Sequence, residues 1–221
     1  MVRLAWKDEA RRYVCEVLAK HGALQFGIFK LTSGKMSPYY VDLRIIPSFP
    51  KVFKRICEIY LDLAKETVGL DAFDRIAGIP TAGIPFASVI AYQAEKPFLY
   101  IREEAKPHGR ERSIEGILMP GERVLIIDDL ITTGKSILRA AKILRGEGAV
   151  VDNALVLLDR EEGGSVALSK EGIRLRSLMS ITEAAQILYD RGIISEENYR
   201  AILRQIKRIP PQLEPQSKSQ P

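Results

Sequence analysis

The sequence predicts an α/β fold built on a doubly wound parallel sheet with helices on both faces. From residue 75 onward, short apolar runs alternate with helical patterns, which is the order of parallel strands joined by crossover helices. The runs are apolar throughout, as in VLII at 124–127, and this is typical of strands buried on both faces. The loops after these strands are rich in glycine and polar residues, as they are where such sheets bind ligands.

Length and composition limit the range of functions. The chain has 221 residues, enough for one domain with a real core but too few for a second catalytic domain. No stretch is apolar and long enough to span a membrane, and the charged amino terminus lacks an apolar signal core, so we expect a cytoplasmic protein. The net charge of +5 suits an anionic ligand, either nucleic acid or a small polyphosphate. Both cysteines fall on apolar helical positions, which predicts buried thiols.

Each element is predicted from its own local pattern. Apolar residues at helical spacing predict the helices, with Asp8 as a cap and Pro85 in a first turn. Alternating aromatic and polar residues around Ser33 and Gly34 predict a β-hairpin or small hood. In chain order we expect helix 8–20, hairpin 26–44, helix 50–66, strand 75–79, helix 85–94, strand 98–102, strand 124–127, helix 135–146, strand 150–159, strand 174–178, helix 182–191 and helix 195–207.

These elements predict a single domain over residues 1–209. The hood takes up about the first 45 residues, and the two terminal helices pack outside the sheet. The tail at 210–221 has too little apolar content to fold, so we expect it to be disordered. The polar stretch at 103–116 is unusually long for a loop inside a compact domain, which indicates a functional or mobile segment.

VLIIDDLITTGKS, at 124–136, places two carboxylates and a hydroxyl-rich turn between a strand and a helix. Asp128 and Asp129 can bind Mg²⁺, orient sugar hydroxyls or cap the helix. The free N–H groups that open the helix, together with nearby hydroxyls, can enclose a terminal phosphate. These hydroxyls belong to Thr132, Thr133 and Ser136. The pattern therefore predicts a sugar phosphate at this turn.

Two better-known phosphate motifs do not fit the sequence. The run GKS at 134–136 reproduces the end of GxxxxGKS, but that motif requires a glycine at position 129, where an aspartate stands. GEGAVV at 146–151 lacks the third glycine of a dinucleotide fingerprint and precedes a strand instead of following one.

VLIIDDLITTGKS resembles the ribose-phosphate signature of the type I phosphoribosyltransferases, which bind phosphoribosyl pyrophosphate and Mg²⁺ on a doubly wound parallel sheet. The resemblance implies that Asp128 and Asp129 contact the ribose 2′ and 3′ hydroxyls and that the following turn holds the 5′ phosphate. It also implies Mg²⁺ bound mainly through phosphoribosyl pyrophosphate, with the two aspartates available as ligands. The turn comprises Leu130, Ile131, Thr132, Thr133, Gly134, Lys135 and Ser136.

A second loop, AGIPTAGIP at 77–85, also lies between a predicted strand and a predicted helix. By itself it is an ordinary glycine and proline turn. It resembles the pyrophosphate-binding loop of the same family, which implies that Thr81 and Ala82 contact phosphoribosyl pyrophosphate. That loop often contains an unusual cis peptide, for which Ile79–Pro80 is the candidate here. Some members carry a lysine in place of Ala82, so the positive charge must come from elsewhere.

The polar stretch carries several cationic side chains, which alone is typical of a solvated charge run. However, REEAKPHG resembles the mobile catalytic loop of the orotate phosphoribosyltransferases. The resemblance implies that Arg102, Lys106 and His108 close over pyrophosphate. In that family the loop reaches into the neighbouring subunit's site, so a homodimer is implied. Glu103 departs from the pattern because many members have a basic residue there.

The hairpin segment FGIFKLTSGKMSPYYVDLR is similar in order and spacing to the amino-terminal segment that holds the base in the orotate enzymes. The resemblance implies that Tyr39 and Tyr40 stack near the base and that the backbone around Tyr40 and Val41 reads its edge. Thr32 stands where some members have a lysine, and we assign that role to Lys30. An aromatic hairpin face packed on the core is the alternative.

LLDREEGG places Arg160 just past the end of a predicted strand, on the same sheet edge as the ribose loop. An arginine fork can hold a planar carboxylate through two hydrogen bonds. The orotate family has a similar LDRxEGG element, which implies that Arg160 binds orotate, with Thr132 also beside the base. The alternative is a surface ion pair of Arg160 with Glu161 or Glu162.

Together the motifs imply transfer of the 5-phosphoribosyl group from phosphoribosyl pyrophosphate to orotate, giving orotidine 5′-monophosphate and pyrophosphate in pyrimidine (UMP) biosynthesis. Two alternatives stay open. A purine phosphoribosyltransferase would share the sugar loops, but the hood and Arg160 argue against it. A regulator that senses phosphoribosyl pyrophosphate would need two DNA-reading helices, and the basic terminal helices at 182–207 keep that alternative open. We expect neither nucleic acid nor a membrane as a partner.

Overall fold

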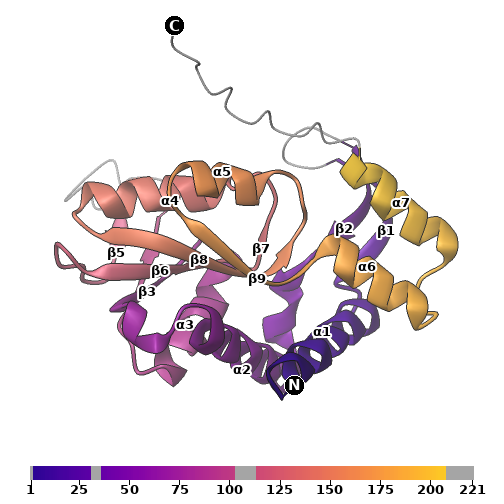
Figure 1. Ribbon diagram of the computed structural model, residues 1–221, viewed down its shortest axis with the longest axis horizontal. Coiled ribbons are helices and arrows are strands. Elements are labelled where there is room, and N and C mark those ends of the chain that lie inside the picture. Colours follow the sequence, from indigo (N-terminus) through magenta and orange to yellow (C-terminus); the bar gives the residue numbers. More distant parts are fainter. Residues whose placement is uncertain (1, 31–35, 103–112, 208–221) are drawn as a thin grey trace, which may run out of the picture.

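The structure is a computed structural model that describes residues 2–30, 36–102 and 113–207. Its main sheet has strand order β5-β4-β3-β6-β8, with β7 and β9 also paired to β8. A separate pair of antiparallel strands, β1 and β2, forms the hood (Figure 1). The helices and strands are α1 (Val2–Lys20), β1 (Leu24–Lys30), β2 (Met36–Val41), α2 (Pro50–Thr67), β3 (Arg75–Gly78), α3 (Gly83–Gln93), β4 (Phe98–Ile101), β5 (Ile114–Glu115), β6 (Arg123–Ile127), β7 (Leu130–Ile131), α4 (Lys135–Gly146), β8 (Val150–Asp159), α5 (Gly164–Lys170), β9 (Arg174–Ser180), α6 (Ile181–Asp190) and α7 (Glu196–Lys207).

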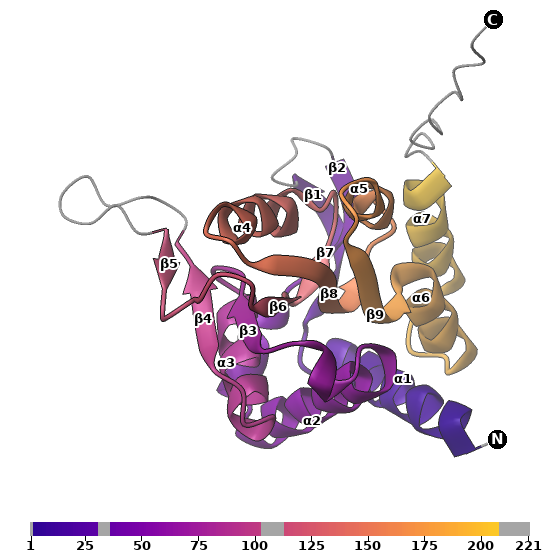
Figure 2. The ribbon, with the colours of Figure 1, turned by 60° about the vertical axis from the view of Figure 1, so that its left-hand side comes forward.

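Helices cover both faces of the main sheet, which confirms the predicted doubly wound architecture. Helices α4 and α5 lie on one face, and α1, α2 and α3 lie on the other (Figures 1 and 2). The strands are parallel except for β5, which pairs antiparallel with β4. Because both faces are covered, the central strands are apolar on both sides, as VLII in β6 shows. Two buried hydrophobic clusters result, one on each side of the sheet.

The predicted elements are present, and the differences from prediction have local causes. Helix α5 was not predicted, since it has only seven residues and begins at a pair of glycines, Gly163 and Gly164, that carry no periodic signal. Strand β5 falls inside the stretch predicted as a loop, because two residues paired to the end of β4 leave no pattern of their own. Helix α1 begins at Val2, earlier than predicted. The predicted turn around Ser33 and the tail at 210–221 lie outside the described residues.

The terminal helices α6 and α7 pack beside the hood and α1, as Figure 1 shows. Helix α6 begins with a capping box, in which Ser180 and Glu183 each satisfy a backbone N–H of the other. Cys15 and Cys57 are buried free thiols, as predicted, and burial raises the pKa of each to about 12.

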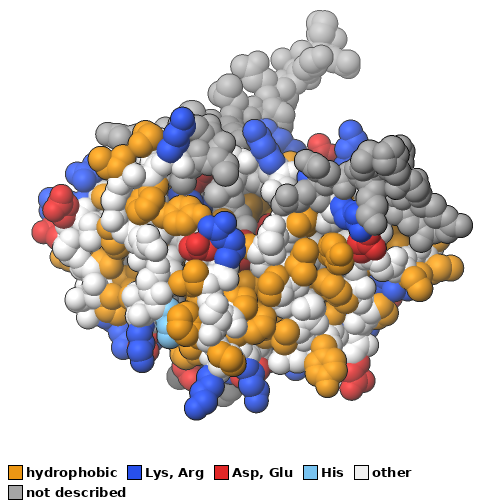
Figure 3. All heavy atoms as spheres, turned by 180° about the vertical axis from the view of Figure 1, so that it is seen from behind, with side chains coloured by type: hydrophobic (Ala, Val, Ile, Leu, Met, Phe, Trp, Pro, Cys, Tyr) orange, Lys and Arg blue, Asp and Glu red, His pale blue; other side chains and the backbone are white. Residues whose placement is uncertain are grey.

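The surface is mixed in character. Figure 3 shows the face opposite to Figure 1, where hydrophobic side chains gather over the centre and lower part. The most exposed large hydrophobic side chains in the described part of the chain are Ile28, Tyr92 and Ile117. Among the described residues, no helix is both long and apolar enough to cross a membrane.

Candidate active site

A cavity of about 540 Å³ opens at the carboxyl ends of β6 and β8, where open α/β sheets bind their ligands. One wall comes from the hood and the other from the turn after β6 and the end of β8. It thus brings together residues from three predicted motifs that lie far apart in the sequence. The lining residues are Lys30, Tyr40, Val41, Asp42, Arg44, residues 128–137, Arg160 and Glu162.

The two carboxylates of the acid pair are buried side by side at the floor of this cavity. Asp128 and Asp129 are each only 8% exposed. Burial raises the pKa of Asp128 well above its usual range, aided by the neighbouring charge of Asp129, and burial raises the pKa of Asp129 to about 6. Neither caps the helix, because the N-cap residue of α4 is Gly134 and no side chain makes a capping hydrogen bond there. The carboxylates are therefore available to a ligand.

The acid pair fits a Mg²⁺ ion that takes most of its ligands from a substrate. The part of the chain that the structure describes contains no group of three or more histidine, cysteine, aspartate or glutamate side chains that could enclose a metal alone. Mg²⁺ is commonly held by one or two protein carboxylates together with substrate phosphates. Two adjacent carboxylates beside a phosphate-binding turn can therefore supply the protein's share of its ligands.

The turn after the acid pair is shaped by two glycines. Gly134 has φ +81°, a left-handed conformation that favours glycine, and it opens α4. Gly164, at the start of α5, donates from its N–H to the Thr132 carbonyl at 2.9 Å. A Cβ at Gly164 would lie 2.6 Å from Ile131 side-chain atoms and from the Thr132 oxygen. The close packing of α5 holds the turn so that the first N–H groups of α4 face a ligand.

The second predicted loop abuts the acid pair. Ile79 donates its N–H to the Ile127 carbonyl at 3.1 Å. A Cβ at Gly83 would lie 2.7 Å from that carbonyl oxygen and 2.9 Å from Asp128 Oδ1, so only glycine allows α3 to begin there. Thr81 and Ala82 follow Pro80 in the loop but do not line the main cavity.

The predicted position of the cis peptide is wrong by one bond. The structure has the cis bond at Pro80–Thr81, not at Ile79–Pro80. Sequence reasoning favoured the bond before the proline because only there is the cis form inexpensive. The bond that is cis has no such local preference.

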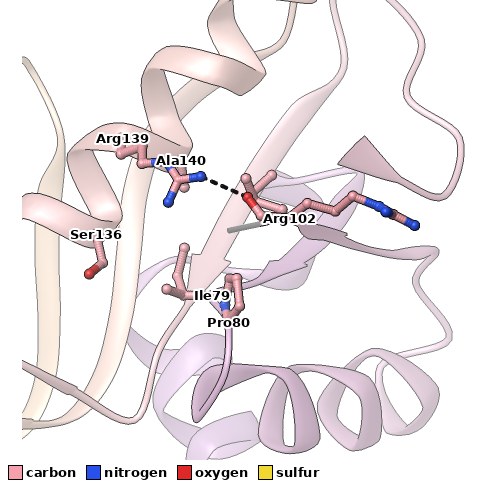
Figure 4. A pocket seen from close by; sticks show the side chains of 7 residues that line it. Ile79, Pro80, Arg102, Ser136, Arg139 and Ala140 are labelled. Carbon is pink, nitrogen blue, oxygen red and sulfur yellow. Dashed lines mark hydrogen bonds between the residues drawn. The ribbon is translucent and has the colours of Figure 1, made fainter. Parts of the chain in front are cut away.

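A smaller cavity of about 320 Å³ lies between the end of β4, the second loop and α4 (Figure 4). Ser136 lines both cavities. Arg102 lines only the smaller one, and its guanidinium extends away from Ser136 to pair with Glu115 of β5. Arg139 donates from Nη2 to the Arg102 carbonyl at 2.9 Å. The structure therefore does not bring the Arg102 guanidinium to the acid pair.

The other residues of the predicted catalytic loop, Glu103, Lys106 and His108, lie outside the described residues.

Arg160 is buried where it lines the main cavity, just past the end of β8. Only 3% exposed, it lies over the Tyr39 ring with its guanidinium carbon 4.8 Å from the ring centroid. Its Nη2 lies 3.0 Å from Glu162 Oε1, but the geometry makes no hydrogen bond, and Nε also lacks an acceptor among the described residues. The predicted alternative of an ion pair with Glu161 or Glu162 is present in part, because Arg160 pairs with Glu162, but both side chains are buried and the pair does not lie on the surface. Unmet hydrogen bonds on a buried guanidinium are costly, so this arginine is suited to an anionic ligand.

Two hood residues that line the cavity, Asp42 and Arg44, were not singled out from the sequence. Arg44 pairs with Asp42 through Nε and Nη2, at 2.7 and 2.9 Å, and its Nη2 donates to Tyr40 Oη at 2.7 Å. This arginine lowers the pKa of Asp42. The Tyr40 ring also stacks on Phe29 with a centroid distance of 5.5 Å. The run DLR directly after SPYYV was the available signal, since it adds an acid and an arginine to an aromatic hairpin.

Tyr39, which was predicted to stack near the base together with Tyr40, does not line the cavity. It is fully buried beneath Arg160, because neighbouring residues of β2 point to opposite sides of the strand. Lys30 and Val41 do line the cavity, as the base-site prediction requires.

Comparisons with known proteins identify the family of this chain. A family model described as "Phosphoribosyl transferase domain" matches residues 51–171. The orotate phosphoribosyltransferase of Cenarchaeum symbiosum is 46% identical over 84% of this chain and 92% of that protein. The crystal structure of orotate phosphoribosyltransferase from Aeropyrum pernix matches with a TM-score of 0.70 and 36% identity, over 82% of this chain and 99% of that one. Leishmania donovani UMP synthase matches with a TM-score of 0.80 and 31% identity, over 90% of this chain and 42% of that longer one. On these matches, the chain belongs to the orotate phosphoribosyltransferase family.

Proposed function

We propose that this chain carries out the orotate phosphoribosyltransferase reaction in the main cavity. The 5-phosphoribosyl group passes from phosphoribosyl pyrophosphate to orotate, giving orotidine 5′-monophosphate and pyrophosphate, in de novo pyrimidine biosynthesis. One observation carries the proposal: a single cavity holds a buried acid pair, a phosphate-binding turn and a buried arginine with unmet hydrogen bonds.

The sugar phosphate binds along the turn after β6. Asp128 and Asp129 accept hydrogen bonds from the ribose 2′ and 3′ hydroxyls, and residues 130–136 enclose the 5′ phosphate with their N–H and hydroxyl groups. Thr81 and Ala82 contact the pyrophosphate from the second loop. The two aspartates would lie beside a Mg²⁺ ion brought in mainly by the substrate's phosphates, and that ion would neutralise part of the pyrophosphate charge.

Orotate binds between the hood and the end of β8. Arg160 offers to the orotate carboxylate the N–H groups of Nε and Nη2, which lack hydrogen-bond acceptors among the described residues. Tyr40 stacks on the base, the Val41 backbone reads its edge, and Lys30 and Thr132 complete the site. The base and the ribose therefore meet at Thr132, which belongs to both subsites.

The reaction needs no covalent intermediate with the protein. Orotate N1 loses its proton and forms a bond to C1′ as the bond from C1′ to the pyrophosphate oxygen breaks. The electrons of the broken bond leave with pyrophosphate, which takes up the released proton or passes it to solvent. The ribose gains oxocarbenium character in between, as sugars do in glycoside hydrolysis. Cationic side chains stabilise the charge that builds on the leaving group. We assign that role to Arg102, Lys106 and His108, with Arg102 released from Glu115 when it acts.

We also propose that the protein is a homodimer in which the loop that carries Lys106 serves the partner's site. The hydrophobic side chains grouped on the face in Figure 3 support an association surface. The cytoplasmic location stays a prediction from the sequence.

Mixing two inactive variants tests the shared loop. In a mixed dimer of Lys106→Ala and Asp129→Asn protomers, a crossing loop leaves one site with both residues intact and places both substitutions in the other. Random pairing should then restore about a quarter of wild-type activity. About half of the dimers are mixed, and one of the two sites in each mixed dimer is intact. Co-expressed protomers with different tags allow the mixed dimer to be isolated. No recovery in that dimer would mean that each loop serves its own subunit.

Loss of orotate absorbance tests the reaction itself. Purified protein is mixed with orotate, phosphoribosyl pyrophosphate and Mg²⁺, and each component is omitted in turn. We expect orotate to be consumed only when all three are present, with one pyrophosphate released per orotate. Unchanged orotate in the complete mixture, with protein that still melts cooperatively, would contradict the proposal.

A further inference from the structure

Two adjacent carboxylates that line one cavity require a break in the strand that carries them. Successive side chains of a regular strand point to opposite faces of the sheet. Asp128 and Asp129 nevertheless both line the main cavity. The backbone must therefore leave the regular strand path at this pair.

The hydrogen bonds to β8 show where the break occurs. Asp128 donates its N–H to the Leu155 carbonyl at 3.1 Å. In a continuous parallel ladder the Leu157 N–H would return the next bond to the Asp128 carbonyl. It donates instead to the Asp129 carbonyl at 3.0 Å. Strand β6 correspondingly ends at Ile127, and β7 begins at Leu130. The Asp128 carbonyl is thus left outside the ladder.

A tyrosine from the helix below supplies the missing donor. Tyr60 of α2 places its Oη 2.8 Å from the Asp128 carbonyl oxygen and 3.3 Å from that of Asp129. Its side chain is fully buried. Burial and the nearby carboxylates raise the pKa of Tyr60 well above its usual value, so the hydroxyl keeps the proton that it donates. A buried carbonyl without a donor would cost about 1–3 kcal/mol.

The same tyrosine touches the element that carries the second loop. Its ring packs against Phe86 of α3, with a centroid distance of 5.6 Å. Helix α3 begins at Gly83, which lies directly against Asp128. Tyr60 therefore contacts both structures that border the sugar site, yet it does not line the cavity.

We propose that Tyr60 is a positioning residue, whose hydroxyl holds the broken strand so that both carboxylates of the acid pair face the ribose. This inference rests on the proposed function, since it assigns Tyr60 to the sugar half of that site. The role lies in the single O–H group, because phenylalanine would fill the same space without donating.

The test compares Tyr60→Phe with Thr67→Val, a control on the same helix. Thr67 donates from Oγ1 to the Leu63 carbonyl at 2.7 Å, so both variants lose one donor to a backbone carbonyl, but only Tyr60 contacts the acid pair. Three quantities are measured in each: affinity for ribose 5-phosphate without metal, the KM values for both substrates, and the melting temperature.

We expect Tyr60→Phe to weaken ribose 5-phosphate binding and to raise the KM for phosphoribosyl pyrophosphate, each about tenfold, the ratio that corresponds to one lost hydrogen bond of about 1.4 kcal/mol. The KM for orotate should stay within about twofold of wild type, since Tyr60 does not border the base. Thr67→Val should bind the sugar phosphate like wild type, even if its melting temperature falls as much as that of Tyr60→Phe.

Two outcomes overturn the inference. Either Tyr60→Phe binds ribose 5-phosphate like wild type, or both variants lose sugar affinity in proportion to their loss of stability, which would make Tyr60 an ordinary core residue. Failure of the proposed function is recognised separately, because then wild-type protein leaves orotate unchanged. The sugar-phosphate affinities would still report on Tyr60 in that case.

Discussion

Replacing Asp129 by asparagine should abolish most activity and at the same time make the ligand-free protein more stable. The two carboxylates are buried next to each other, and burial raises the pKa of both. Asparagine removes one buried charge at nearly constant shape, which should raise the free energy of unfolding by roughly 1–3 kcal/mol. The same change removes a charged acceptor for a ribose hydroxyl, so we expect kcat/KM for phosphoribosyl pyrophosphate to fall by about 10²-fold or more.

Denaturation with and without phosphoribosyl pyrophosphate and Mg²⁺ measures both effects. Wild type should gain stability from the ligand, because a ligand that binds only the folded protein stabilises it more the higher its concentration is relative to Kd. Asp129→Asn should gain little, because its Kd is expected to be much higher. Asp152→Asn is the matched control, since Asp152 is exposed on β8 and should change neither quantity. A variant that is less stable than wild type, or that keeps the ligand's stabilisation, would contradict the role assigned to the acid pair.

Replacing Arg160 by glutamine should raise the KM for orotate by about 10²-fold or more and leave the KM for phosphoribosyl pyrophosphate nearly unchanged. Two charge-assisted hydrogen bonds of about 1.5–3 kcal/mol each would be lost on the base carboxylate. Arg160→Lys should not restore binding, because a lysine keeps the charge but lacks the planar fork. Steady-state kinetics with each substrate varied in turn separates the two KM values.

A second variant separates binding from stability. Arg160→Gln leaves Glu162 buried without its partner at 3.0 Å, and such an unpaired charge destabilises by about 3–5 kcal/mol. The double variant Arg160→Gln with Glu162→Gln should recover most of the lost stability but none of the orotate affinity. If the double variant also recovers the wild-type KM for orotate, Arg160 does not bind the base.

The main features of the site could be predicted because they belong to contiguous segments at strand ends. Asp128 and Asp129 follow an apolar run, the phosphate turn follows them directly, and Arg160 follows the neighbouring strand. Carboxyl ends of parallel strands meet at one edge of the sheet, so these segments had to approach one another. The structure places all three in one cavity.

Features that depend on contacts between distant elements could not be predicted in this way. Tyr60 lies 68 residues before Asp128 on a helix whose apolar spacing predicted burial alone. The pairing of Arg102 with Glu115 depends on β5, which two residues cannot reveal as a strand. The burial of Glu162 beside Arg160 depends on the turn between β8 and α5, where the run of charged residues favoured a surface location.

A panel of bases tests the central claim most directly. Wild-type protein with phosphoribosyl pyrophosphate and Mg²⁺ is given orotate, uracil, adenine or hypoxanthine, and the pyrophosphate released is measured. The carboxylate that we propose Arg160 binds is present only on orotate, so we expect rapid release with orotate and at least about 10²-fold slower release with uracil and the purines. Release with a purine and none with orotate would contradict the account.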